Sequence, residues 1–223
     1  MSTLEKIHKY LKETLELTDD EITAFDSGSV YIAQEIALYA HRNQYRENGE
    51  RYVTHPFNCL DSYRKLVGII PDDYFCIDTD LMAKHAIPFD GVQEVCVLHD
   101  VLEDTDFSMA EIEEVFSGSG FNTYFQLYIK KPLELITHNE SVPYKDYIYL
   151  VLENPISAIV KMMDMVDNLN VLGLAELNEK KIERTKGYLD YIKIINDKYH
   201  FIERALNYKI DFNKERMEQV TEE

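Results

Sequence analysis

Apolar residues recur every three or four positions along most of this chain, which is the spacing of one face of an α-helix. Near the C-terminus, Tyr188, Ile192, Ile195 and Tyr199 alternate steps of four and three residues. Helix-breaking residues are sparse, with 8 Gly and 6 Pro among 223 residues, and strand-like alternation is rare. We therefore expect an all-α fold, built as a compact bundle of many helices.

Two capping boxes mark helix starts, at Thr18 with Glu21 and at Ser108 with Glu111. Together with the apolar spacing they predict helices from residue 18, then over 29–44, 56–66, 92–103, 108–118, 121–137, 143–153, 155–171 and 188–207, with a loop and one short helix in 68–90. We expect a single domain over residues 1–212, with an insertion near 68–84 and a charged, frayed tail at 213–223.

The chain is strongly acidic: Asp and Glu number 41 against 23 Lys and Arg, a formal net charge of −18. This charge opposes non-specific binding to nucleic acid or to an anionic membrane, and no apolar run approaches the ~20 residues that cross a bilayer. The N-terminus has no apolar signal core, and Cys59, Cys76 and Cys96 lack CxxC spacing. We expect reduced, packed cysteines, a cytoplasmic location, and no nucleic-acid or membrane partner.

His99 and Asp100 end a segment whose preceding residues are apolar. If the helix continues, Glu103 stacks on His99 and Asp104 on Asp100, which gathers three carboxylates and an imidazole within one turn. A divalent metal would offset the repulsion between these groups. A helix-end ion pair, or an acidic helix end that faces water, would explain the same residues.

A second group of polar residues lies in the apolar helix expected at 155–171. Asp164 and Asn168 are four residues apart on one face, with Asp167 beside them. Carboxylates in apolar surroundings seldom serve packing, although a polar stripe that faces water would look the same.

A third pattern is the loop that leads to His55 and Pro56. Its arginines suit bidentate binding of phosphate, so the loop is either a candidate phosphate clamp or a basic surface loop with a helix-opening His-Pro. The arginines concerned are Arg42, Arg46 and Arg51, with Arg64 beyond the loop.

Taken together, these patterns resemble the HD-domain metal phosphohydrolases, and most closely the hydrolase domain of RelA/SpoT-type enzymes and the small alarmone hydrolases. The matching stretches are AHRNQYRENGERYVTHP (40–56), VLHDVLEDTDFSMAEIEEVF (97–116) and VKMMDMVDNLNVL (160–172), in the family's order. The resemblance implies an HD-domain helix bundle. It also implies hydrolysis of (p)ppGpp, the guanosine polyphosphate of the stringent response, at the bond between the pyrophosphate and the ribose 3′ oxygen.

Carried over by position, the resemblance implies a set of four metal ligands: His55, His99, Asp100 and Asp164. Manganese is the usual ion in the family, and this mixed ligand set also permits iron or zinc. Glu103 and Asp104 would orient or deprotonate the attacking water. The residues expected beside the nucleotide substrate are Arg46, Asn168, Tyr52 and Arg42.

The chain departs from the family in two places. The third motif typically reads ADRLHN, whereas here it reads MDMVDN, with Met165 in place of Arg and Asp167 in place of His. The interval between His55 and His99 is longer than in the small alarmone hydrolases, and its extra acidic residues are candidates for a lid or rim.

We therefore expect a metal-dependent phosphohydrolase that acts on a nucleotide, with (p)ppGpp 3′-pyrophosphohydrolase as the leading function. One alternative is a phosphomonoesterase that acts on another phosphorylated metabolite. Another is a non-catalytic module that senses a nucleotide. The sequence also leaves open a homo-oligomer formed through the last helix.

Overall fold

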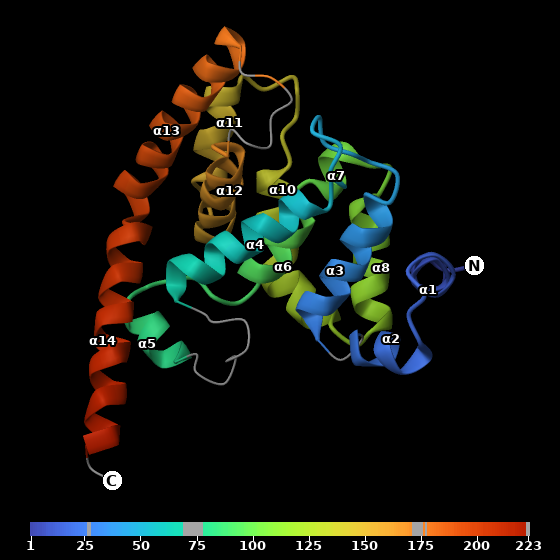
Figure 1. Cartoon of the computed structure of the whole chain (residues 1–223), viewed down its shortest axis with the longest axis horizontal. Helices are drawn as coiled ribbons and strands as arrows, with labels where there is room; N and C mark the ends of the chain where they lie inside the picture. The colour runs from blue at the N-terminus through green and yellow to red at the C-terminus, as the bar shows by residue number, and fades with distance from the viewer. Residues whose placement is uncertain (26–27, 69–77, 171–175, 177, 222–223) are drawn as a thin grey trace.

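The computed structural model describes residues 1–25, 28–68, 78–170, 176 and 178–221. Within these residues the regular elements are helical, apart from one isolated antiparallel bridge between Tyr45 and Arg51 (Figure 1). In chain order they are α1 (Thr3–Thr14), α2 (Asp19–Phe25), α3 (Ser29–Ala40), α4 (Thr54–Val67), α5 (Thr79–Lys84), α6 (Val92–Leu98), α7 (Val101–Asp104), α8 (Met109–Gly118), α9 (Asn122–Tyr124), the π-helical η2 (Phe125–Ile129), α10 (Lys130–Ile136), α11 (Tyr144–Val151), α12 (Pro155–Asn168), α13 (Glu179–Tyr199) and α14 (Phe201–Thr221). The expected all-α fold is confirmed.

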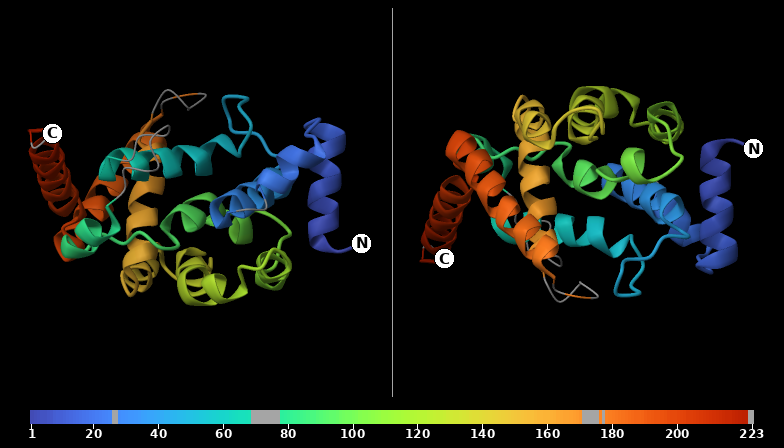
Figure 2. Two further views of the ribbon diagram at one scale, coloured as in Figure 1. Left: turned by 90° about the horizontal axis from the view of Figure 1, so that it is seen from below. Right: turned by 90° about the horizontal axis from the view of Figure 1, so that it is seen from above.

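Helix α12 lies at the centre of the bundle and packs against α4, α6, α10 and α13. Helix α6 also packs against α3, and apolar side chains from these helices join in one buried core. The helices α1 and α14 lie at opposite ends of the molecule (Figure 2). The mutual packing of α4, α6 and α12 brings together the polar residues that begin α4, follow α6 and end α12.

The predicted capping boxes are both present. The Thr18 amide donates to the Glu21 carboxylate at 2.8 Å, and the Glu21 amide donates to the Thr18 hydroxyl at 3.3 Å. Ser108 and Glu111 make the same reciprocal pair, at 2.9 and 3.3 Å. Each box satisfies amide groups that a helix start leaves without partners, so these starts could be predicted from local sequence.

The helix expected over 92–103 is interrupted at His99 and Asp100, where α6 ends and α7 follows. Every residue of α6 is buried. The helix begins after Gly91, whose φ is 77° and where an added Cβ would lie 2.3 Å from the Tyr128 carbonyl oxygen. Glycine is required here because no other residue permits so close an approach.

The helix expected over 121–137 contains the π-helical segment η2. Pro132 supplies the reason, since it has no amide hydrogen for the Tyr128 carbonyl four residues earlier and its ring crowds that carbonyl. This is the carbonyl that Gly91 approaches. Pro132 and Gly91 therefore fix together how α6 lies against η2.

The single helix expected over 188–207 is two helices in the structure, the end of α13 and the start of α14. His200 has a left-handed φ of 54° and separates α13 from α14. Buried residues lie on both sides of it, Ile195 before and Phe201 after, so the apolar spacing did not reveal the break. The backbone of α14 stays helical to Thr221, through most of the tail that was expected to fray.

Part of the insertion expected near 68–84 can be described. Residues 69–77, including Cys76 and most of the acidic stretch considered as a lid or rim, lie outside the described residues. The remainder carries α5, and His85 just after it pairs with Asp211 of α14 at 3.0 Å. Cys59 and Cys96 are free, buried thiols, as expected. In the described part of the chain, no helix is both long enough and apolar enough to cross a membrane.

Candidate metal centre

Four side chains meet where α4, α6 and α12 pack together. His55 lies in the first turn of α4, His99 and Asp100 directly follow α6, and Asp164 lies one turn before the end of α12. His55, His99 and Asp164 are at most 5% exposed. These are the four residues to which the family resemblance assigned the role of metal ligands.

Their polar atoms converge on one point. Nε2 of His55 lies 3.3 Å from Nε2 of His99, 3.1 Å from Oδ1 of Asp164 and 3.4 Å from Oδ2 of Asp100. Nε2 of His99 lies 3.1 Å from Oδ1 of Asp100 and 3.8 Å from Oδ1 of Asp164.

This spacing fits a single divalent ion. Neighbouring ligand atoms that bind a metal at about 2.0–2.2 Å stand about 2.8–3.6 Å apart in octahedral or tetrahedral geometry. Two facing imidazole nitrogens need a proton or an ion between them, and the flanking carboxylates favour a cation. The residues present therefore suit a divalent metal, and the mixed nitrogen and oxygen set admits manganese, iron or zinc.

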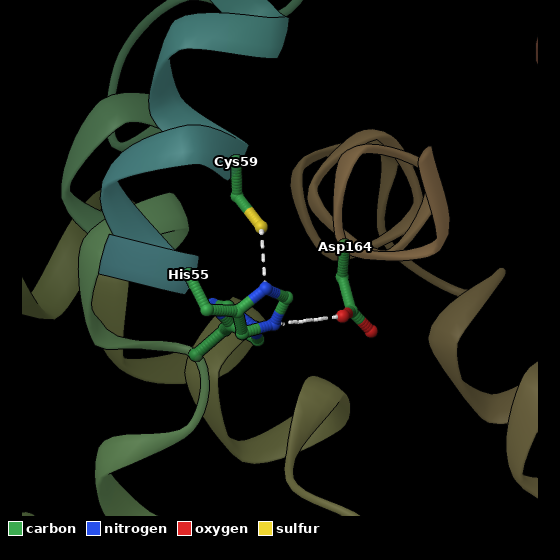
Figure 3. Close-up of side chains that lie close together, drawn as sticks. His55, Cys59 and Asp164 are labelled. Carbon is green, nitrogen blue, oxygen red and sulfur yellow. Dashed lines mark hydrogen bonds and ion pairs between the residues drawn. The ribbon is translucent and has the colours of Figure 1, made fainter. Parts of the chain in front are cut away.

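Cys59 supplies a further donor atom, but on another side of the His55 ring. Donor atoms of His55, Cys59, His99 and Asp164 all lie within 4.8 Å of one another. Figure 3 shows the Cys59 thiol facing Nδ1 of His55, at 3.9 Å, whereas Asp164 faces Nε2. The two nitrogens point away from each other, and burial raises the pKa of the thiol to about 12. An ion bound at Nε2 is therefore not shared with Cys59.

Asp167 is the hydrogen-bond partner of Nδ1. Its Oδ2 lies 2.6 Å from Nδ1 of His55 and 3.0 Å from Nη1 of Arg46. A carboxylate only accepts hydrogen bonds, so Nδ1 is the donor in this pair. Arg46, expected beside the substrate, is thus joined through Asp167 to the residues of the metal centre.

Asp164 is held through both of its oxygens. Nζ of Lys161 lies 2.8 Å from Oδ2, and Nδ2 of Asn168 donates to Oδ1 at 2.6 Å. Burial alone would raise the pKa of Asp164, but Lys161 and the two histidines bring it well below its usual value, so the carboxylate is ionised. Lys161 was missed in the sequence, although its spacing of three residues from Asp164 is that of a helical ion pair.

Tyr52 connects Asp100 to Asp104. Its hydroxyl lies 2.8 Å from Oδ2 of Asp100 and 2.6 Å from Oδ2 of Asp104. The Asp104 amide also donates to the Asp100 carbonyl at 2.8 Å, so these two residues keep the helical relationship that the sequence predicted. Tyr52, expected beside the substrate, touches two carboxylates of the candidate site.

The Glu103 carboxylate has a hydrogen-bond partner outside the four expected ligands. It accepts a hydrogen bond from the His138 amide at 2.9 Å, and partial desolvation of the carboxylate raises its pKa although the residue as a whole is exposed. His99 is buried and Glu103 is exposed, on either side of the interruption between α6 and α7. The hydrogen-bond partner that the structure gives Glu103 is the His138 amide.

The Arg42 side chain turns back onto α3, the helix that precedes it. Its Nη1 donates to the Tyr39 carbonyl at 2.6 Å, and its Cζ lies 4.1 Å from the centre of the Tyr39 ring. It lines a cavity of about 550 Å³ whose wall also includes Glu103 and Asp104. The two arginines considered as a phosphate clamp therefore have separate partners: Arg42 contacts Tyr39, and Arg46 contacts Asp167.

A basic cavity of about 750 Å³ beside α13 was not anticipated from the sequence. Its lining residues are Glu47, Glu176, Asn178, Lys180, Lys181 and Arg184. The Arg184 guanidinium lies 6.0 Å from the centre of the Tyr188 ring. Burial raises the pKa of the Tyr188 hydroxyl, and the Arg184 guanidinium opposes this shift. The only sign of this cavity in the sequence is the run of cations Lys180, Lys181 and Arg184 in an otherwise acidic chain.

The chain is similar in sequence to three guanosine-3′,5′-bis(diphosphate) 3′-pyrophosphohydrolases. A guanosine-3′,5′-bis(diphosphate) 3′-pyrophosphohydrolase from Borreliella burgdorferi is 34% identical over 117 residues, which are 52% of this chain but 14% of the relative. One from Drosophila melanogaster is 24% identical over 184 residues, which cover 79% of this chain and 88% of the relative. One from Aquifex aeolicus is 29% identical over 161 residues and is covered to 19% of its length. The chain thus spans under a fifth of the two bacterial relatives.

A solved structure supports the fold. It is that of a metazoan ortholog of SpoT described as hydrolysing ppGpp, and it aligns with a TM-score of 0.53 and 19% identity over 85% of this chain and 96% of its own. No protein-family model matches the chain.

Proposed function

Because the chain is homologous to the guanosine-3′,5′-bis(diphosphate) 3′-pyrophosphohydrolases and has their HD-domain fold, we propose that it is a metal-dependent nucleotide phosphohydrolase that releases pyrophosphate from the ribose 3′ oxygen of (p)ppGpp. The observation that carries this proposal is the convergence of His55, His99, Asp100 and Asp164 at ligand spacing. The buried, free thiols Cys59 and Cys96 suit the reducing cytoplasm.

In this proposal His55, His99, Asp100 and Asp164 would hold manganese. A bound divalent ion lowers the pKa of a coordinated water and polarises a phosphoryl oxygen. The chain fixes the geometry, since Lys161 and Asn168 orient Asp164 while Tyr52 orients Asp100. Each carboxylate ligand is therefore held by at least one other residue, which is what a pre-organised metal site requires.

Asp104 and Glu103 handle the proton of the attacking water. Asp104 is the better placed, because the Tyr52 hydroxyl holds it beside Asp100. Glu103 has a raised pKa, which suits a group that takes up and returns a proton.

A polyanionic substrate must find positive charge in a chain of net charge −18. The cavity beside α13 offers it through Lys180 and Arg184, since Lys181 is already paired with Glu47. We assign this cavity to the substrate's phosphates, because arginine and lysine are the usual phosphate-binding side chains. We assign Asn168, which donates to Asp164 at the end of α12, to the ribose.

The test is a hydrolysis screen with manganese, in which guanosine tetraphosphate, nucleoside mono-, di- and triphosphates and a generic phosphomonoester are compared. We expect pyrophosphate from the tetraphosphate alone, and no turnover by Asp100→Ala. Release of single phosphate from monophosphates would instead establish a phosphomonoesterase. Nucleotide binding without turnover of any substrate would establish a sensing module.

A further inference from the structure

We propose that Asp167 is a positioning residue of the metal centre, which fixes the orientation and the tautomer of His55 and is itself held by Arg46. This inference rests on the proposed metal-dependent function. It concerns a position at which the chain departs from the motif of the family it resembles, with Asp in place of His.

The first argument is the geometry around one imidazole. Helix α12 places a carboxylate at each ring nitrogen of His55, with Oδ1 of Asp164 3.1 Å from Nε2 and Oδ2 of Asp167 2.6 Å from Nδ1. The two aspartates are three residues apart and therefore lie on the same face of the helix. One turn of α12 thus holds the ring from two sides.

The second argument is burial. The His55 and Asp167 side chains are 5% and 7% exposed, so water competes little for their hydrogen bond. Arg46 is 18% exposed, and its Nη1 lies 3.0 Å from the same Oδ2 of Asp167. A buried carboxylate needs such a partner, and here a cation and a ring N–H share one oxygen.

The chemical consequence concerns Nε2. Because Asp167 accepts the hydrogen on Nδ1, the neutral ring must present the lone pair of Nε2 to the point where His99, Asp100 and Asp164 converge. Carboxylates that accept from the far nitrogen of a metal-bound histidine orient the ring and raise its basicity. Asp167 cannot itself bind the ion, because it lies on the Nδ1 side.

The test compares the manganese affinity of Asp167→Asn with that of the unchanged protein, by competition with a fluorescent chelator. The amide can donate to Nδ1, which would move the ring hydrogen to Nε2. We expect an affinity about 10–100-fold lower, and at saturating manganese a fall in kcat with KM little changed. Cys59→Ala is the matched control, since it alters the other neighbour of Nδ1 and should keep its manganese affinity within about 3-fold of the unchanged protein.

Unchanged manganese affinity in Asp167→Asn, with lost affinity in Asp100→Asn, would overturn the positioning role and leave the metal centre intact. Unchanged affinity in both variants would instead overturn the metal centre. If Asp167→Asn fails to fold, Asp167→Glu decides, because it keeps a carboxylate for Nδ1. A Glu variant that binds manganese within about 10-fold of the unchanged protein supports the role, and one that binds no metal contradicts it.

Discussion

His55 and His99 face each other through their Nε2 atoms, 3.3 Å apart, although they are 44 residues apart in the chain. Neither nitrogen has a backbone partner there, since His99 uses Nδ1 for the Cys96 carbonyl at 2.8 Å and His55 uses Nδ1 for Asp167. Two buried imidazoles oriented in this way need a proton or an ion between them, and we propose that a shared ion fills this role.

Removing one proposed ligand should therefore remove the ion. We expect Asp100→Asn to lower manganese affinity by more than about 100-fold and to abolish turnover with it, because Asp100 lies close to both Nε2 atoms. Metal analysis of the dialysed protein, together with steady-state rates, measures both effects. Asp106→Asn, at an exposed acid close by, is the control. Full metal content in Asp100→Asn would rule Asp100 out as a ligand.

The Tyr52 hydroxyl should matter for catalysis more than for folding. It contacts Asp100 and Asp104 together, so we expect Tyr52→Phe to lower kcat about 10–100-fold. Kinetics at saturating manganese would measure this loss. Tyr45→Phe is the matched variant, since Tyr45 lies in the same loop and is 61% exposed. Equal kcat values for the two variants would show that the hydroxyl is dispensable.

Local signals in the sequence predicted much of the fold. The boxes at Thr18 and Ser108 satisfy helix-end amides through residues three positions away, so they could be recognised from the sequence. The interruptions were not predicted. The break at His99 and Asp100 follows an apolar helix with no proline or glycine at the break, and the turn at His200 preserves the apolar spacing.

The candidate site could be predicted in part for a similar reason. The carboxylates and histidines carry a recognisable spacing, and the structure brings the four expected ligands together. Their supporting contacts depend on tertiary packing. The pairing of Asp167 with His55, 112 residues away, has no local signal, nor does the cavity that joins Glu47 to α13.

Lys161 should stabilise the metal-free fold through Asp164. Both side chains are buried, at 11% and 8% exposure, with Nζ and Oδ2 2.8 Å apart. We expect Lys161→Met to lower the free energy of unfolding by about 3–5 kcal/mol, because a buried carboxylate loses its charged partner. Urea unfolding measures this. The exposed pair of Lys193 and Asp197 supplies the control, since Lys193→Met should change stability by about 0.5 kcal/mol or less. Similar losses in the free energy of unfolding for Lys161→Met and Lys193→Met would contradict the stabilising role of the Lys161–Asp164 pair.

The pH dependence of stability should reverse when metal is added. Burial alone would lower the pKa of His55, but Cys59, Asp164 and Asp167 raise it well above its ordinary value. The stabilisation from His55 is therefore fully present below the unfolded pKa of about 6.5 and is lost as pH rises through the folded-state pKa. Manganese needs unprotonated Nε2 atoms, so the stabilisation it adds should grow with pH.

Urea unfolding of chelator-treated and manganese-loaded protein, between about pH 6 and pH 9, would show this reversal. Two curves with the same dependence on pH would mean that manganese displaces no proton from the histidines.

The most direct test of the metal centre is anomalous diffraction from crystals grown with manganese, recorded just above the manganese absorption edge. One strong peak is expected within about 2.0–2.3 Å of Nε2 of both His55 and His99, with Asp100 and Asp164 completing its coordination. A peak confined to exposed carboxylates, with none between the two histidines at saturating manganese, would contradict the assignment of these four residues as a metal site.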